Sequence, residues 1–137
     1  EFIAVAYEPI SCFNAAKALD WNITGIVHLC AGSPSATAPV ECYKNASAKP
    51  GWNSTAALTL CSGASSATAP IDCFDQMWED SLFAGWTSEA VVRTCRGSAS
   101  ASRTIDCIHT AVKSSQQLTV LGAALLCTGN NLFTRSY

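Results

Sequence analysis

The chain has 137 residues and a formal net charge of −2, a length that suits one domain with a modest core. Its eight Lys and Arg residues are scattered, which excludes a basic surface for nucleic acid and a polybasic membrane patch. The longest strongly apolar run, Val120 to Cys127, is far shorter than the roughly 20 residues of a spanning helix, so we expect no membrane insertion.

Along the chain, an apolar segment at residues 1–7 precedes four copies of a two-cysteine unit, and a tail follows at residues 130–137. The linkers from Cys30 to Cys42, Cys61 to Cys73 and Cys95 to Cys107 align without a gap. Within each copy the second cysteine follows the first by 18, 19, 22 and 20 residues. We predict a single repeat domain over residues 1–137, with repeats at about 8–32, 38–63, 69–97 and 103–129.

Each copy is predicted to form two short helices. Apolar residues of the first helix recur at helical spacing around its cysteine, as at Ile71, Cys73 and Met77. Thr37, Thr68 and Ser102 are the expected N-caps of this helix. An acidic residue stands before each of these cysteines (Glu41, Asp72 and Asp106). We expect it in the first turn of the helix, where the helix dipole stabilises a negative charge.

The second helix of each copy has an aligned cap position and an aligned glycine. The expected N-caps are Asn22, Asn53, Thr87 and Thr119, and Trp21, Trp52, Trp86 or Leu118 stands directly before each. The expected left-handed C-cap residues are Gly32, Gly63, Gly97 and Gly129. The sequence therefore predicts an all-α fold of four stacked helical hairpins, a short α-solenoid, with each cysteine on a buried stripe.

An even count of eight cysteines at regular spacing is typical of a disulfide framework in an oxidising compartment, which indicates an extracellular or cell-surface protein. An antiparallel hairpin places the early part of its first helix beside the late part of its second. The pairs predicted from this register are Cys12–Cys30, Cys42–Cys61, Cys73–Cys95 and Cys107–Cys127. A second register pairs across the linkers and leaves Cys12 and Cys127 for links between molecules; eight buried free thiols are a third alternative.

Stacked hairpins with a repeat period of 30 to 34 residues resemble the α-solenoid families, and a disulfide within each hairpin is similar to the cysteine-rich relatives of tetratricopeptide-type repeats. The resemblance is architectural, since those families lack this Cys-x-Gly signature, and it implies no functional residue. The signature itself resembles cysteine-rich repeats of large secreted or surface proteins and covers about residues 8 to 129.

Metal binding and catalysis find little support in the sequence. No Cys-x-x-Cys pair is present, and neither His28 nor His109 is repeated in the other copies. Motifs for a nucleophile elbow, a zinc protease or a phosphate loop are also missing. We expect no metal, no cofactor and no enzymatic activity.

Three N-glycosylation sequons begin at Asn22, Asn45 and Asn53. Asn22 and Asn53 are equivalent positions, where glycans would line one edge of the array. The alternative is that these two Asn side chains serve only as helix caps.

Both ends of the array are apolar, and surfaces at opposite ends of a repeat array are complementary, so that contacts between copies grow into a filament. The self-association candidates are Phe2, Ile3, Val5, Tyr7, Val120, Leu121 and Leu125. The leading hypothesis is a structural subunit of an extracellular, glycosylated filament or matrix that binds copies of itself head to tail.

Two alternatives to self-assembly stay open. The first is a secreted recognition or adhesion module that binds other extracellular proteins or glycans, with variable positions such as Asn14, Lys44, Asp75 and His109 as its reading surface. The second is a fragment of a longer surface repeat protein.

Overall fold

The structure, a computed structural model, describes residues 7–18 and 22–130, and within these ranges all regular secondary structure is helical. The helices are α1 (Pro9–Lys17), α2 (Ile23–Cys30), α3 (Ala38–Ser47), α4 (Ser54–Cys61), α5 (Ala69–Glu79), α6 (Ser88–Cys95), α7 (Ala101–Ser114) and α8 (Val120–Thr128), with a 3-10 helix, η1 (Ser81–Phe83), between α5 and α6.

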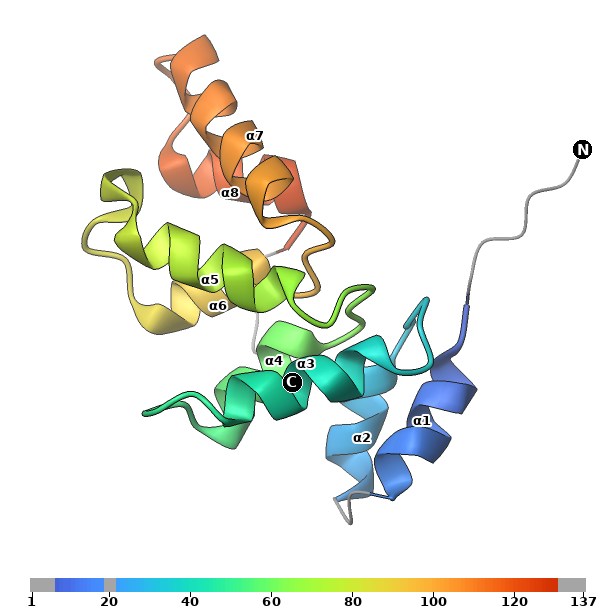
Figure 1. Cartoon of the computed structure of the whole chain (residues 1–137). Helices are drawn as coiled ribbons and strands as arrows, with labels where there is room; N and C mark the ends of the chain where they lie inside the picture. The colour runs from blue at the N-terminus through green and yellow to red at the C-terminus, as the bar shows by residue number, and fades with distance from the viewer. Residues whose placement is uncertain (1–6, 19–21, 131–137) are drawn as a thin grey trace, which may run out of the picture.

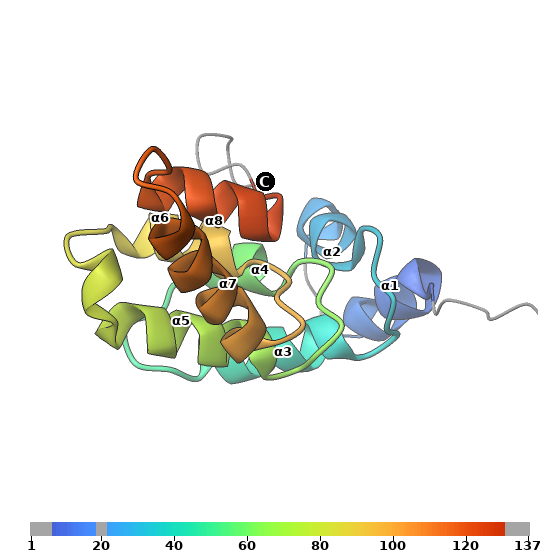
Figure 2. The same ribbon diagram turned by 90° about the horizontal axis from the view of Figure 1, so that it is seen from above.

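Consecutive helices pair into four hairpins that stack in chain order as one array (Figure 1). The first helix of each hairpin contacts the first helix of the next, and the second helices do the same. Seen from above, α3 and α5 lie on one side of the array, and α4, α6 and α8 lie on the other (Figure 2). The expected all-α fold of disulfide-linked helical hairpins is confirmed.

The first helices of the second and third repeats begin where expected, but other residues make the capping bonds. Thr37 and Thr68 occupy the cap positions of α3 and α5, but their side chains make no capping bond. Ser35 and Ser66, two residues earlier, accept the Ala38 and Ala69 amides at 3.0 and 3.1 Å.

The fourth repeat departs further from the expected cap positions. Its first helix, α7, begins at Ala101, and Ser100 caps it by accepting the Arg103 amide at 3.3 Å. Pro39 and Pro70 allow no earlier start in α3 and α5, since proline within a helix lacks the amide and clashes with the preceding turn. Thr104 stands at the aligned position of α7, so the helix extends back past the expected cap Ser102.

The second helices begin as expected. The side chains of Asn22, Asn53, Thr87 and Thr119 each accept the amide three residues further on, at 2.7 to 3.2 Å. The predicted C-terminal glycines all have positive φ, between 63° and 71°. Trp52 and Trp86 are partly buried against the core, and Trp21 lies outside the described residues.

The longer third repeat uses its extra residues to form η1 and to bury Phe83. The Phe83 ring makes edge contacts with Trp86 and with His109 of α7, at centroid distances of 5.1 and 6.2 Å. The insertion therefore links the third hairpin to the fourth.

The buried side chains of all four hairpins form one continuous core. Its largest fully buried members include Ile26, Leu60, Met77 and Ile108, one from each repeat. Because neighbouring hairpins share this core, each of the first three repeats is covered by the next one along the array.

Candidate functional site

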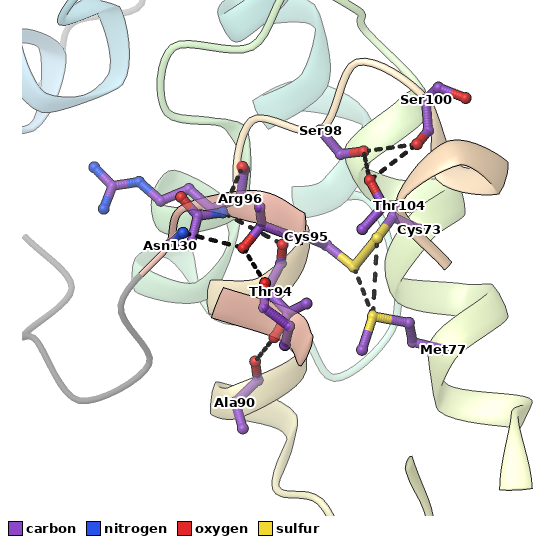
Figure 3. Close-up of a disulfide and its surroundings, with 12 residues drawn as sticks. Cys73, Met77, Ala90, Thr94, Cys95, Arg96, Ser98, Ser100, Thr104 and Asn130 are labelled. Carbon is purple, nitrogen blue, oxygen red and sulfur yellow. Dashed lines mark hydrogen bonds between the residues drawn. A yellow bond between two sulfur atoms is a disulfide. The ribbon is translucent and has the colours of Figure 1, made fainter. Parts of the chain in front are cut away.

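All eight cysteines are paired within the chain, as Cys12–Cys30, Cys42–Cys61, Cys73–Cys95 and Cys107–Cys127, with Cα–Cα distances of 5.6 to 5.9 Å. These are the pairs that the hairpin register predicts. In the third repeat the Met77 sulfur lies 3.3 Å from the Cys95 sulfur and 3.9 Å from that of Cys73 (Figure 3). This disulfide is therefore packed as part of the apolar core.

Six cysteines lie on a buried stripe as expected, but the fourth pair is a correction. Cys107 is exposed and Cys127 is only partly buried. The disulfides of the first three repeats are fully enclosed, and each of those repeats is followed by another hairpin. The fourth disulfide therefore lies on a face of the fourth repeat that no other described hairpin covers.

A short backbone ladder joins the second helices of the first three repeats. The Gly63 amide donates to the Leu29 carbonyl at 2.8 Å, and the Gly97 amide donates to the Leu60 carbonyl at 2.9 Å. A Cβ atom on Gly63 would lie 3.2 Å from the Ala31 carbonyl oxygen, and one on Gly97 would lie 3.1 Å from that of Ser62. These glycines allow both the turn and the close approach of the preceding repeat.

The fourth repeat continues the ladder with a side chain. The Gly129 amide bonds within its own helix, to the Leu125 carbonyl at 2.8 Å. The Asn130 Nδ2 atom instead donates to the Thr94 carbonyl at 3.3 Å and to the Arg96 carbonyl at 3.2 Å (Figure 3). Thr94 is the counterpart of Leu29 and Leu60, so Asn130 occupies the place of the amide donor.

Exposed large apolar side chains gather at the two ends of the array. Among the described residues they are Tyr7, Ile10, Ile23 and Val27 in the first repeat, Leu121, Leu125 and Leu126 in α8, and Trp78 of α5 alone between them. We call the first group the first-repeat face and the second the fourth-repeat face. Beside the first-repeat face lies an apolar groove of about 220 Å³ lined by residues of α1 and α2, among them Pro9 and Phe13.

The predicted self-association residues fall partly on these faces. Tyr7, Leu121 and Leu125 are exposed, whereas Val120 is partly buried because it packs against the hairpin core. Phe2, Ile3 and Val5 lie outside the described residues. The sequence interpretation missed Ile10 and Leu126, since both occupy positions that are core in the other repeats.

The three sequon asparagines are all exposed. The Oδ1 atoms of Asn22 and Asn53 accept the cap bonds from Gly25 and Ala56, at 3.0 and 2.7 Å. Since each cap uses only the oxygen, capping does not occupy the nitrogen to which a glycan is attached. Asn45 lies on the exposed side of α3.

Two of the four variable positions considered for recognition make polar contacts with a side chain of another repeat. Asp75 pairs with Lys49 at 3.2 Å, and His109 Nε2 lies 2.7 Å from the Asp80 carboxylate. Burial raises the pKa of Asp80, but hydrogen bonds from His109 and the Leu82 amide, together with the charge of His109, lower it below the ordinary value of 3.8. These side chains therefore contribute to hairpin stacking.

Residues 7–18 and 22–130 contain neither a metal-binding cluster nor a membrane-spanning helix. No group of three or more His, Cys, Asp or Glu side chains is close enough to hold a metal ion. No helix in this part of the chain has the length and apolar character needed to cross a membrane.

Four disulfide-linked hairpins that share one core define a cysteine-rich helical repeat protein whose disulfides are suited to an oxidising environment. No protein-family model matches the chain, and neither a curated protein nor a solved structure matches it.

Proposed function

We propose that this chain is a structural subunit of an extracellular, glycosylated filament or matrix, which grows by docking the fourth-repeat face of one copy onto the first-repeat face of the next. The observation that carries the proposal is a comparison of aligned positions in the four repeats. Residues that are buried between consecutive repeats inside the array are exposed where no neighbouring repeat lies against them.

Two positions show the equivalence at the first-repeat face. Ile10, two residues before its cysteine, is 75% exposed, whereas its counterparts in the later repeats are at most 9% exposed. Val27 is 50% exposed, and its counterparts are at most 6% exposed. The counterparts are Val40, Ile71 and Ile105 for Ile10, and Leu58, Val92 and Ala124 for Val27. These positions are covered in every repeat that follows another hairpin.

The fourth-repeat face shows the opposite pattern. Leu126 is 71% exposed, whereas Leu29, Leu60 and Thr94 at the aligned position are at most 2% exposed. This position is covered in every repeat that precedes another hairpin. The two faces therefore have the chemistry of the two sides of one internal repeat interface, and apolar faces of this kind mark interaction sites.

A contact between these faces is heterologous, since it joins different surfaces of the two copies, and such a contact grows into an open assembly unless its rotation closes a ring. The internal ladder suggests the register: the Gly32 amide of the next copy would donate to the Leu126 carbonyl of the copy before it, as Gly63 donates to Leu29 of the repeat before it.

Aspartate substitutions on the two faces test the proposal by sedimentation velocity. We expect the wild-type chain to form concentration-dependent oligomers, and Leu126→Asp and the double variant Ile10→Asp/Val27→Asp each to be monomeric. Mixing the two variants leaves one intact pair of faces, so the mixture should give 1:1 dimers that grow no further. Trp78→Asp, an exposed apolar residue away from both faces, is the matched control and should still assemble.

A wild-type chain that is monomeric at every concentration would contradict the proposal. The two remaining hypotheses would then be a recognition module and a fragment of a longer repeat protein. Growth of the mixed variants beyond dimers would contradict the head-to-tail arrangement.

Export and glycosylation are tested separately. When the chain is expressed through a eukaryotic secretory pathway, we expect peptide mapping to find glycans on the exposed residues Asn22, Asn45 and Asn53. Unmodified peptides at all three sequons would remove glycosylation from the proposal.

A further inference from the structure

Side-chain contacts between repeats recur at one pair of aligned positions. We call the residue two places after the first cysteine of a repeat its leading residue, and the residue seven places after that cysteine its trailing residue. The trailing residues of the second and third repeats are Lys49 and Asp80, and the leading residues of the third and fourth are Asp75 and His109. Lys49 Nζ lies 3.2 Å from the Asp75 carboxylate, and His109 Nε2 lies 2.7 Å from that of Asp80. In both cases the trailing residue of one repeat meets the leading residue of the next.

The two contacts are complementary in opposite senses. Between the second and third repeats, Lys49 donates and Asp75 accepts. Between the third and fourth, the Asp80 carboxylate can only accept, so His109 Nε2 is the donor. A second repeat docked on a copy of itself would instead place Lys49 against Lys44, and a third repeat docked on a copy of itself would place two aspartates together. Because like charges repel, these two positions distinguish the correct neighbour from a wrong one.

At the two ends of the array, these positions hold neutral polar residues. Asn14 is the leading residue of the first repeat, and Ser114 is the trailing residue of the fourth, at the end of α7. Both are exposed, whereas the four residues in contact between repeats are all partly buried. The Ser114 hydroxyl donates to the Ala111 carbonyl at 2.9 Å, so its oxygen can still accept an amide N–H. Leu19, the trailing residue of the first repeat, lies outside the described residues.

We infer that Asn14 of one copy bonds to Ser114 of the copy before it where the fourth-repeat face docks onto the first-repeat face, and that this contact sets the register between the copies. The inference rests on the proposed head-to-tail assembly and names a polar contact within it. Asn14 Nδ2 donates and Ser114 Oγ accepts, so the pair is complementary without charge. Opposite charges introduced at the two positions should therefore strengthen the contact between copies, and like charges should weaken it.

Charge substitutions in the 1:1 dimer test this contact at a single junction. The Ile10→Asp/Val27→Asp chain keeps the fourth-repeat face and receives Ser114→Lys. The Leu126→Asp chain keeps the first-repeat face and receives either Asn14→Asp or Asn14→Lys. Relative to the two parent chains, we expect the first combination to bind about threefold more tightly and the second about threefold more weakly, the scale of an exposed charge pair. Sedimentation velocity at low salt gives both dissociation constants, and the difference should shrink in about 0.5 M sodium chloride.

Asn45→Asp in the Leu126→Asp chain is the matched control, since Asn45 is exposed on α3 and is neither a leading nor a trailing residue. It should change the affinity for the Ser114→Lys chain by less than Asn14→Asp does. Equal affinity of the Asn14→Asp and Asn14→Lys chains for the Ser114→Lys chain would overturn the inference, while the dimers themselves would still support the proposed assembly. Parent chains that form no dimer would contradict the proposed assembly, and the inference with it.

Discussion

At the scale of single residues, glycine has two roles in the second-helix turns. Gly32, Gly63 and Gly97 share a left-handed backbone, with φ between 63° and 67°. Only Gly63 and Gly97 also lie against the carbonyl of a preceding repeat, because a Cβ on Gly32 would meet nothing within 4 Å. The same residue type thus provides turn geometry alone at one position and turn geometry plus stacking at the other two.

Alanine substitutions should separate these roles. We expect Gly32→Ala to lower the free energy of unfolding by about 1 kcal/mol, the cost of a left-handed non-glycine residue. Gly97→Ala should lower it by about 2 to 3 kcal/mol, because the added methyl also presses on the Ser62 carbonyl. Urea denaturation with the disulfides intact measures both, and equal losses would contradict the stacking role of Gly97.

The Asp80–His109 pair predicts a defined dependence on pH. Because the pKa of Asp80 is lowered in the folded protein, its contribution to stability is present above the ordinary pKa of 3.8 and is lost as the pH falls through the lowered value. We expect Asp80→Asn to destabilise the protein by about 1 kcal/mol at pH 7 and by much less at pH 2.

Thermal unfolding between pH 2 and pH 7 measures this difference. Asp75→Asn, which breaks the more exposed pair with Lys49, is the matched control and should have a smaller effect at pH 7. An Asp80→Asn effect that does not change with pH would contradict the assignment.

At the scale of helices and hairpins, crosslinks compensate for short elements. Most of the helices have 8 to 11 residues, below the length at which an isolated helix is stable. Each disulfide closes a loop of 18 to 22 residues and contributes about 3 kcal/mol in the chain-entropy model. The next hairpin then covers the bond, except in the fourth repeat.

This difference predicts selective reduction under native conditions. A mild thiol reductant should open Cys107–Cys127 first, because these two cysteines are more exposed than the other six, while the three enclosed disulfides stay intact. Alkylation followed by peptide mass spectrometry identifies the opened pair. Opening of Cys42–Cys61 at an equal or higher rate would contradict the enclosure argument.

At the scale of the whole molecule, the array has few charges on its surface and apolar groups at its end faces. Charged residues make up 13% of the chain, about half the usual 25% share, and the seven exposed apolar residues of the two faces carry no charge. Association through such faces is hydrophobic, so its dependence on salt differs from that of an electrostatic contact.

Salt and temperature should therefore each change the extent of oligomer formation in a predictable direction. We expect ammonium sulfate to strengthen oligomer formation and cooling from 25 °C to about 4 °C to weaken it, because apolar burial loses strength in the cold. Sedimentation velocity of the wild type measures both effects. Dissociation on adding moderate sodium chloride would indicate a charged interface and contradict the proposed contact.

The sequence by itself determined the four hairpins and the caps of the second helices, and it favoured the disulfide partners that the structure shows. This follows because local chemistry and regular spacing specify those features: the Asn or Thr cap, the glycine two residues after the cysteine, and the cysteine pair recur in every copy. The start of α7 was missed because the fourth repeat lacks the proline that Pro39 and Pro70 place at the start of α3 and α5, so its helix begins earlier.

Only the tertiary structure decided which aligned positions are covered and which are exposed. Ile10 and Leu126 are indistinguishable from core residues by periodicity, since burial at those positions depends on a neighbouring repeat. The exposure of Cys107 and the contact between His109 and Asp80 likewise depend on how the hairpins pack. The spacing of residues within one repeat does not show whether another repeat packs against it.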